Sequence, residues 1–433
     1  MEASSRPGTA PGRRLGIAAV AACVLLTLSG CPVGEERPAE DSALPGAPDP
    51  GRETDASTGL PEYSGPPADA PRSAGPPGSV VAAVDLTAAA PGIFSRVDAA
   101  VAVPDGRVLV ALSPVGVSGP PVLGTVQGAA VAGSVPMTGV QDLWGLHPLA
   151  DGTVVATGSL RAPDGRRAGY GTAVVDPRAG TVRTTVVVPY TGKTRFALGR
   201  SALAPDGRTL YLFVSTRTAA GPDERLVLLD SASGTVRVER DLGAVVATAS
   251  ESPAGHELAG LVPQPDGGVT LVLDATPDRT RAGRIPTLIT LDPRLDPVGE
   301  PVRVTSLAEQ AQTHAVAAGT DGTTFLVAEV RDGAWVLAVP PGGGAGPVLA
   351  QFEDDFDYGL VVEPAQVWGL LPAREGARAV DLTTGELRPP VDVGCPGRDI
   401  RGLFPGADGG SALLIGECNS PRTRTQMLWL LGP

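Results

Sequence analysis

Several residue types that would point to a particular function are scarce in this chain. Aromatic residues make up only 4% of the 433 residues, and Lys193 is the single lysine among 34 basic residues. The formal net charge is −13. A chain this acidic offers no positively charged surface to phosphate groups and few rings on which bases can stack, so we expect no nucleic-acid binding.

Familiar catalytic motifs are also missing. No Gly-x-Ser-x-Gly nucleophile motif occurs, and Gly169-Tyr170-Gly171 lacks the third glycine of a dinucleotide-binding fingerprint. Gly192-Lys193-Thr194 resembles the end of a phosphate-binding loop, but Val187 stands where that loop requires glycine. Nucleophilic hydrolysis and nucleotide binding therefore have no support from motifs.

The chain has no apolar run long enough to cross a membrane as a helix, which takes roughly 20 residues. Its longest run covers residues 15–28, after a leader that contains Arg6, Arg13 and Arg14. A basic leader followed by a short apolar run is typical of a cleaved export signal. We therefore predict that residues 1–30 are a signal peptide.

The end of this signal, Leu28-Ser29-Gly30-Cys31, resembles the lipobox of bacterial lipoproteins. In that family the leader is cleaved before the cysteine, which becomes the mature N-terminus and carries the acyl chains, palmitate among them. The resemblance implies that Cys31 is lipidated and holds an exported protein on the extracytoplasmic face of the cell membrane. The alternatives are an uncleaved anchor and a chance cysteine after an ordinary signal peptide.

The four cysteines agree with export. Cys23 lies in the leader and Cys31 would carry the lipid, which leaves Cys395 and Cys418 as an even pair. Exported proteins favour disulfides, so we predict a Cys395–Cys418 bridge. A metal site is the weaker alternative, because neither cysteine belongs to a Cys-x-x-Cys pair and no histidine is near them in sequence.

Residues 31–78 form a segment without hydrophobic periodicity. Positions 32–78 are rich in proline, glycine, alanine and serine and contain nine Asp or Glu residues against three arginines. Such a segment cannot bury enough apolar surface to offset the entropy of ordering, so we predict a disordered tether. Its flexible reach is about 35 to 40 Å, at roughly 5 to 6 Å times the square root of its length.

From residue 79 onward the sequence repeats. Turns of the Asp-Gly type recur between short apolar runs, at Asp105, Asp151, Asp206, Asp266, Asp321 and Asp408. Pro364-Ala365-Gln366 fills the one wide gap as a degenerate seventh turn. Most units contain a second turn led by aspartate, such as Asp176 to Gly180 and Asp230 to Gly234. Two hairpins per unit predict four strands per unit.

Four-stranded units that repeat every 40 to 60 residues are typical of β-propeller blades. We therefore predict that residues 79–433 form an all-β, seven-bladed β-propeller. The last unit has three clear strands, and residues 80–86 form a strand without a unit, so we expect the N- and C-terminal strands to pair and close the ring. The turn chemistry around Asp206 is similar to bacterial propellers of the YVTN and lactonase type. A pair of β-sandwiches or a β-solenoid is the alternative fold.

Polar residues recur near the start of the predicted innermost strands. Aligning the units on the proline near each first turn compares residues at the same distance before it. The position six residues earlier is occupied by Asp98, Asp142, Gly199, Glu257, His314, Tyr358 and Asp399. In a propeller, we expect these side chains to gather at one mouth of the central channel.

Two interpretations of this ring remain open. Asp98, Asp142, Glu257, His314 and Asp399 could bind Ca²⁺ or a polar ligand. Alternatively, the acids cap strand starts and face water, and ion pairs with Arg195, Arg200 and Arg401 would favour such a structural ring. His256 is expected near the same mouth, and His147 at the opposite end in a structural role.

These observations favour a lipid-anchored binding or scaffolding module at the cell envelope, with an envelope protein or a small ligand as its partner. The alternative is a propeller enzyme, either a lactonase-like hydrolase or a quinone-dependent dehydrogenase, with its site at the channel mouth. An enzyme requires several of the candidate side chains to converge on one point. A binding module requires an exposed patch on one face.

Overall fold

The protein is described from a computed structural model. It describes residues 75–90, 95–115, 119–192, 196–218, 221–250, 256–276, 284–304, 307, 311–330, 333–341, 347–352, 359–373, 376–395, 398–419 and 424–432. The predicted signal peptide, Cys31 and most of the predicted tether lie outside these residues. Within the described residues, no helix has the length and apolar character needed to cross a membrane.

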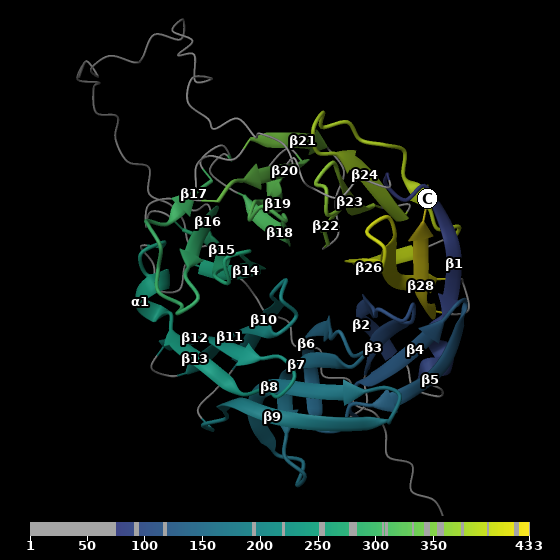
Figure 1. Cartoon of the computed structure of the whole chain (residues 1–433), viewed down its shortest axis with the longest axis horizontal. Helices are drawn as coiled ribbons and strands as arrows, with labels where there is room; N and C mark the ends of the chain where they lie inside the picture. The colour runs from purple at the N-terminus through teal and green to yellow at the C-terminus, as the bar shows by residue number, and fades with distance from the viewer. Residues whose placement is uncertain are drawn as a thin grey trace, which may run out of the picture. The chain divides into compact units, whose positions relative to one another are not determined.

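The strands form seven four-stranded antiparallel sheets arranged as the blades of a propeller, which confirms the predicted fold (Figure 1). Blade 1 consists of β2 (Ser95–Ala102), β3 (Val108–Pro114), β4 (Val122–Gln127) and β5 (Ala130–Pro136). Blade 2 consists of β6 (Val140–Pro148), β7 (Val154–Arg161), β8 (Arg167–Asp176) and β9 (Thr181–Pro189). Blade 3 consists of β10 (Phe196–Leu203), β11 (Thr209–Thr218), β12 (Gly221–Asp230) and β13 (Val236–Asp241). Blade 4 consists of β14 (His256–Pro263), β15 (Val269–Ala275), β16 (Ile285–Leu291) and β17 (Val302–Arg303). Blade 5 consists of β18 (Gln312–Ala318), β19 (Thr324–Val330), β20 (Gly333–Val339) and β21 (Val348–Phe352). Blade 6 consists of β22 (Val361–Val362), β23 (Trp368–Ala373), β24 (Gly376–Asp381) and β25 (Val391–Asp392).

Blade 7 is built from both ends of the chain. Its first three strands are β26 (Arg398–Pro405), β27 (Ala412–Asn419) and β28 (Arg424–Gly432), and its outermost strand is β1 (Ser79–Asp85). Strand β1 pairs antiparallel with β28, from Ser79 opposite Gly432 to Asp85 opposite Met427. The predicted closure of the ring by terminal strands is therefore confirmed, and it covers the edge of β28.

A short 3-10 helix, η1 (Leu86–Ala89), carries the chain from blade 7 to blade 1. Asp85 caps it by accepting a hydrogen bond from Thr87 N at 2.8 Å, and Leu86 is fully buried. Gly124 in β4 makes room for the helix, because a Cβ at that position would lie 2.8 Å from the Cβ of Ala89. The only other described helix is α1 (Gly243–Val246), before blade 4.

The two ends of the blades differ in their connections. At the turn end, tight turns join the first strand to the second, and Gly106 and Gly207 adopt φ values of 80° and 66° in two of them. Asp206 fixes one such turn by accepting a hydrogen bond from Arg208 N at 2.8 Å. In blades 1 to 6 the chain also passes from the third strand to the fourth at this end. At the mouth end, the innermost strands begin. Because successive strands are antiparallel, the second strands end there too.

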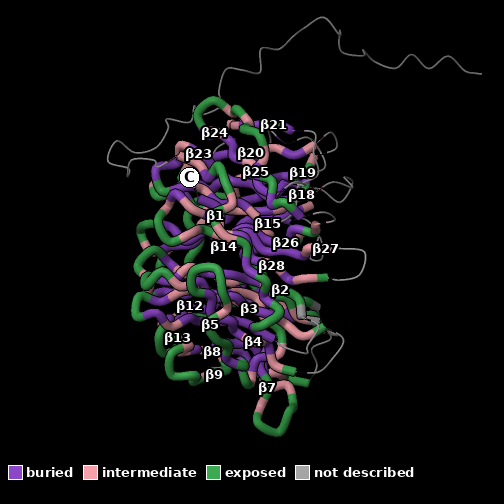
Figure 2. Tube along the Cα trace, turned by 90° about the vertical axis from the view of Figure 1, so that its right-hand side faces the viewer, coloured by how far each residue is buried: buried purple, intermediate pink, exposed green. Residues whose placement is uncertain are grey.

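The apolar core is divided among the seven junctions between blades. Each of seven buried clusters combines residues from two neighbouring blades, and Figure 2 shows buried strands beneath more exposed turns. At the junction of blades 7 and 1, for example, Ile415 and Leu428 pack with Val97 and Val110. Every blade therefore depends on both neighbours for its burial.

Polar contacts also join neighbouring blades at the turn end. Asp105 of blade 1 binds Arg107 at 2.7 Å and Arg178 of blade 2 at 2.5 Å. The hydrogen bond from Arg107, with help from Arg178, holds the pKa of the Asp105 carboxyl well below its usual range. Between blades 3 and 4, the hydroxyl of Tyr211 donates to the carbonyl of Gly267 at 2.6 Å.

Candidate functional site at the mouth of the propeller

The hydrogen bonds of the first turn in each blade show which residues of the seven innermost strands occupy the same position. The first residue of each turn is Val103, Leu149, Ala204, Gln264, Gly319, Glu363 or Gly406. Pro104, Pro205 and Pro364, together with Thr320, follow this residue, whereas Pro148, Pro263 and Pro405 precede it. Aligning the units on these prolines therefore mixed two positions that lie two residues apart.

Five innermost strands share a β-bulge five residues before the turn. The extra residue is Asp98, Trp144, Ala259, His314 or Arg401. Asp98 and His314 therefore occupy the bulge, while Asp142, Glu257 and Asp399 lie two residues nearer the strand start. All five candidates lie in the mouth-end part of their strands, but they form two rows, and Tyr358 lies outside the described residues.

All four candidate acids already have a partner. Asp142 accepts a hydrogen bond from Ser159 Oγ at 2.5 Å, and Glu257 pairs with Arg284 at 2.8 Å. In blades 1 and 7, an arginine and an aspartate two residues apart on the innermost strand form an ion pair, and their order along the chain differs between the two blades. In blade 1, Arg96 precedes Asp98 by two residues and pairs with it at 2.8 Å.

In blade 7 the order of the two charges is exchanged. Asp399 precedes Arg401 by two residues, and their side chains are 2.7 Å apart. Arg401 also pairs with the buried Glu417 at 3.0 Å. This is the ion pairing that we expected of a structural ring. Arg200 forms no ion pair with the described residues, and Arg195 lies outside them.

Both mouth-end histidines contact carboxylates. His314 Nε2 lies 2.6 Å from Glu329 Oε2 within blade 5. His256 Nε2 lies 2.8 and 2.9 Å from the two carboxylate oxygens of Glu224, across the junction of blades 3 and 4. The side chains of this second pair are only 9% and 8% exposed, so the contact is part of the interior of the junction.

Sequence reasoning missed the acids and amides that cross the junctions from the second and third strands. Asp274 in β15 accepts hydrogen bonds from Thr313 N at 2.9 Å and Thr313 Oγ1 at 2.7 Å. Burial raises the pKa of its carboxyl to about 6. Gln426 in β28 accepts a hydrogen bond from Val97 N at 3.2 Å. For Asp274, the signal available in the sequence was a single carboxylate within a mostly apolar strand, Val269–Ala275.

His147 lies toward the turn end, as expected, and its contacts are structural. Its Nε2 is 2.7 Å from Ser201 Oγ, which is also 2.7 Å from Thr157 Oγ1. Burial lowers the pKa of His147 to about 4. A Cβ on Gly145 would overlap Ser201 Oγ, so the absence of a side chain at position 145 makes room for this hydroxyl between blades 2 and 3.

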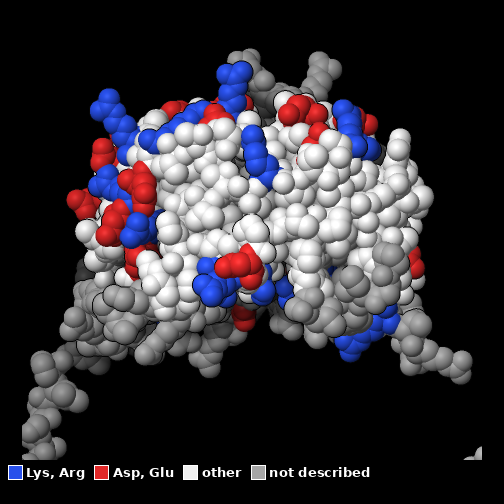
Figure 3. Space-filling view, turned by 90° about the horizontal axis from the view of Figure 1, so that it is seen from below, with Lys and Arg blue, Asp and Glu red and all other residues white. Residues whose placement is uncertain are grey.

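The described residues contain no group of three or more His, Cys, Asp and Glu side chains arranged to hold a metal ion. The expected Ca²⁺ therefore has no ligand set in the described part of the chain. In Figure 3, positive and negative side chains lie next to one another, with uncharged areas between the groups. At the mouth end, Asp98, Glu257 and Asp399 are each paired with an arginine, so opposite charges lie next to one another there.

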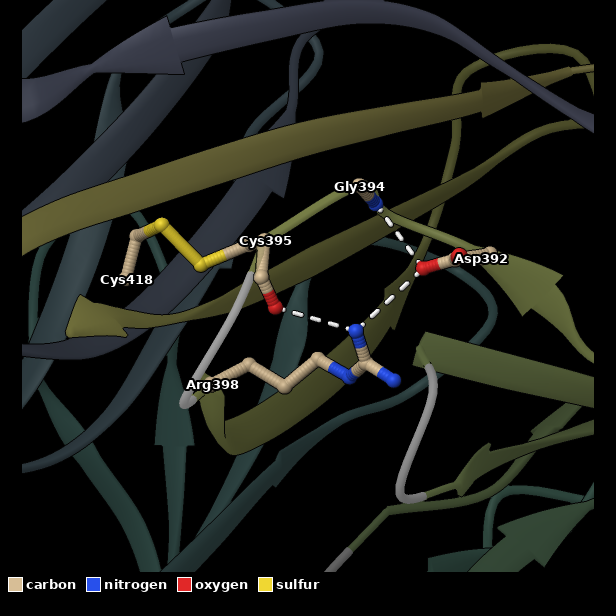
Figure 4. Close-up of a disulfide and its surroundings, with 5 residues drawn as sticks. All are labelled: Asp392, Gly394, Cys395, Arg398 and Cys418. Atoms are coloured by element: carbon tan, nitrogen blue, oxygen red, sulfur yellow. Dashed lines mark hydrogen bonds and ion pairs between the residues drawn. A yellow bond between two sulfur atoms is a disulfide. The ribbon is translucent and has the colours of Figure 1, made fainter. Parts of the chain in front are cut away.

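The predicted disulfide is present at the mouth end of blade 7. Cys395 and Cys418 are joined, with their Cα atoms 5.7 Å apart. Arg398 Nη1 donates to the Cys395 carbonyl at 2.9 Å and to Asp392 Oδ1 at 3.3 Å (Figure 4). The bridge joins the segment before β26 to the end of β27. Its second cysteine, Cys418, directly follows Glu417.

The comparisons with known proteins support the fold alone. No family model matches the chain, and no curated protein matches it. Its structure is similar to a puromycin hydrolase (18% identity, TM-score 0.54, 82% of this chain and 55% of that chain). It also resembles the Cps50 (Swd1) β-propeller domain of Myceliophteria thermophila (12%, 0.50, 77% and 96%) and an oligogalacturonate lyase of Vibrio parahaemolyticus (11%, 0.50, 78% and 91%). The chain spans about half the length of the puromycin hydrolase.

Proposed function

We propose that this protein is a lipid-anchored binding module that presents the mouth end of its propeller to a partner at the cell envelope. The observation that carries the proposal is the separation of the two ends. Strand β1 begins opposite Gly432 at the turn end, and the N–H of Gly78 donates to the carbonyl of Gly432 at 2.9 Å. A tether would therefore join the domain at the turn end, which is the end opposite the mouth.

The side chains at the mouth end suit binding better than catalysis. Asp142, Glu257 and Asp399 are exposed, yet each is held by a neighbouring hydroxyl or guanidinium. Fixed and partly neutralised groups lose little entropy on binding, which is the advantage of a preorganised surface. The enzyme alternative needs converging catalytic groups. The enzyme alternative has the support that a puromycin hydrolase and an oligogalacturonate lyase have a similar fold. No cluster of side chains among the described residues favours it.

Photo-crosslinking in intact cells tests which end is presented. A photoreactive residue is placed at Glu257, at the mouth end, or at the exposed Ala232 in the turn between β12 and β13. We expect a discrete crosslinked product from position 257 and none from position 232. Equal crosslinking from both positions, or products from position 232 alone, would contradict the proposed orientation.

Anchoring is tested separately by Cys31→Ala. Because the lipobox resemblance implies that the lipid is attached to this sulfur, we expect the variant to leave the membrane fraction or to accumulate as an unprocessed precursor. Cell fractionation and the intact mass of the protein measure both outcomes. A variant that stays in the membrane with its leader removed would rule out lipid anchoring through Cys31.

A further inference from the structure

The rim of the ring is formed by the outermost strand of each blade: β5, β9, β13, β17, β21, β25 and β1. Half of the backbone N–H and C=O groups of such a strand point away from its sheet, so another strand can pair with it. Most of these strands carry some protection against pairing. β17 and β25 have two residues each, and β13 contains Arg237, Glu239 and Arg240, all of which form ion pairs.

Strand β9 lacks this protection. It has nine residues, more than any other outermost strand. Residues 181–186 pair with β8 in six consecutive steps without a bulge, whereas the longest such run in β5 or β1 covers four. Five of these six residues are threonine or valine, which favour an extended strand. No hydrogen bond from the described residues reaches the outward-facing backbone groups of this run.

The surroundings of this edge carry little charge. Arg183 is the one charged residue of β9, and its Nη2 donates to the carbonyl of Ala232 in blade 3 at 2.6 Å. β9 lies at the lower edge of the ring in Figure 1, and Figure 3, which views the molecule from that side, shows a broad uncharged area in the middle. The whole chain has a net charge of −13, so two copies repel each other over most of their surfaces. An edge without a carboxylate favours their approach.

A second copy of β9 fits this edge by symmetry. Two identical antiparallel strands pair about a twofold axis, and the axis passes through a residue, because opposite residues must both direct their backbone groups outward. The two central residues of the unbulged run are Arg183 and Thr184. An axis at Arg183 would place two guanidinium groups opposite each other, which is unfavourable. An axis at Thr184 pairs the two copies of Thr184 and pairs Val182 with Val186, while Arg183 lies opposite Thr185.

The direction of β9 determines how the two copies are oriented. β9 runs along the rim of the ring, with β8 on its inner side (Figure 1). The twofold axis of an antiparallel pair is perpendicular to the sheet, and at β9 this direction follows the central channel. The two channels are then parallel, with both mouth ends on one side and both chain entries at Gly78 on the other. Two copies anchored to one membrane need this arrangement.

We propose that two copies of this chain associate through β9, with Thr184 on the twofold axis, and join their second blades into one eight-stranded sheet. This inference goes beyond the proposed binding function, which concerns the mouth end, and only its argument from orientation rests on the proposed lipid anchor. Residues 32–74 of the same chain are a poorer occupant of the edge, because their many prolines donate no hydrogen bond to a ladder.

Oxidative crosslinking in intact cells tests the pairing. Opposite residues of an antiparallel pair have Cα atoms about 4.5 to 5.5 Å apart, which a disulfide can span. We expect Thr184→Cys to give a covalent dimer with twice the mass of one chain. Ser134→Cys is the matched control, because Ser134 is an exposed residue of β5, the uncharged outermost strand of blade 1. It should give no covalent dimer.

Light scattering by the full chain in detergent tests the association without a crosslink. We expect a dimer for the wild type and for the control Ser134→Lys, and a monomer for Thr184→Lys, because its two lysines would lie opposite each other. Calorimetry should show the same unfolding transition for both lysine variants, since both positions are exposed.

A monomeric wild type, or equal covalent dimers from positions 184 and 134, would overturn the proposal. A dimer that persists in Thr184→Lys would place the interface elsewhere. A covalent adduct of position 184 with a different protein would show that β9 pairs with that protein and not with a second copy. Crosslinking from position 257 reports on the mouth end, so the proposed binding function stands or falls separately.

Discussion

The turn end and the mouth end of this propeller use the same residue types in different ways. At the turn end, aspartates such as Asp206 are exposed and accept hydrogen bonds from the backbone of their own turn. At the mouth end, Asp274, Glu224 and Glu417 are buried and bind a different strand or the next blade. Local contacts repeat in every unit, whereas contacts across junctions are free to differ. The turn end is therefore nearly the same from blade to blade, whereas the mouth end differs from one junction to the next.

The largest expected effect comes from removing the strand that runs between the two ends. Deleting residues 79–85 removes β1, exposes the edge of β28 and uncovers Leu428. An exposed edge strand is a template for aggregation, so we expect loss of the soluble protein. Deleting residues 35–74 should leave the unfolding temperature nearly unchanged. Size-exclusion chromatography and calorimetry compare the two, and equal tolerance of both deletions would contradict closure by terminal pairing.

The disulfide gives the mouth end of blade 7 a covalent support. Replacing Cys395 and Cys418 together by alanine opens a loop of about 24 residues, which the chain-entropy model values at roughly 3 kcal/mol. We expect the free energy of unfolding to fall by about that amount. Denaturant unfolding of the variant and of the wild type gives the difference. Because Cys395 is buried in the junction with blade 6, part of the loss will be packing.

The difference between the turn end and the mouth end also explains how much of the structure could be predicted from the sequence. Asp-Gly turns are local signals, so the seven units, their strands and the closing strand were readable from the sequence. The alignment at the mouth end was wrong because Pro104 and Pro148 lie on opposite sides of the first turn residue, and no residue type marks a β-bulge. Asp274 and Gln426 were missed because their partners are distant in sequence. Only the folded junction brings Thr313 and Val97 to them.

Titration distinguishes the two ends, because two buried groups there have pKa values shifted in opposite directions. Burial raises the pKa of Asp274 to about 6 at the mouth end, so its contribution to stability is greatest at low pH and is lost as the pH rises through 6. Burial lowers the pKa of His147 to about 4 nearer the turn end, so its contribution is present above pH 6.5 and is lost as the pH falls toward 4. Between pH 7 and 5 the two contributions oppose each other.

Single substitutions should separate these contributions. Each shifted group changes the free energy of unfolding by about 1.4 kcal/mol per pH unit within its window. Relative to the wild type, Asp274→Asn should lose stability more steeply from pH 7 to pH 5, and His147→Gln less steeply. Asparagine can still accept the Thr313 hydrogen bonds, and glutamine can still reach Ser201. Unfolding curves at both pH values measure the slopes, and parallel curves for all three proteins would show that neither group titrates as described.

The smallest expected effect concerns the conformation of a turn glycine. Gly207 has a φ of 66°, and a Cβ there would meet no atom within 4 Å, so the cost of Gly207→Ala is backbone strain alone. We expect a loss of about 1 kcal/mol, and a smaller loss for Gly207→Asn, because asparagine adopts this region more readily. Gly133 in β5 has equally open surroundings without a positive φ, so Gly133→Ala is the control and should not destabilise the protein. Equal losses at Gly207 and Gly133 would mean that conformation is not what the turn requires. Equal losses for Gly207→Ala and Gly207→Asn would also mean that the turn does not require the positive φ of glycine. The hydrogen bonds to Asp206 would then be what fixes the turn.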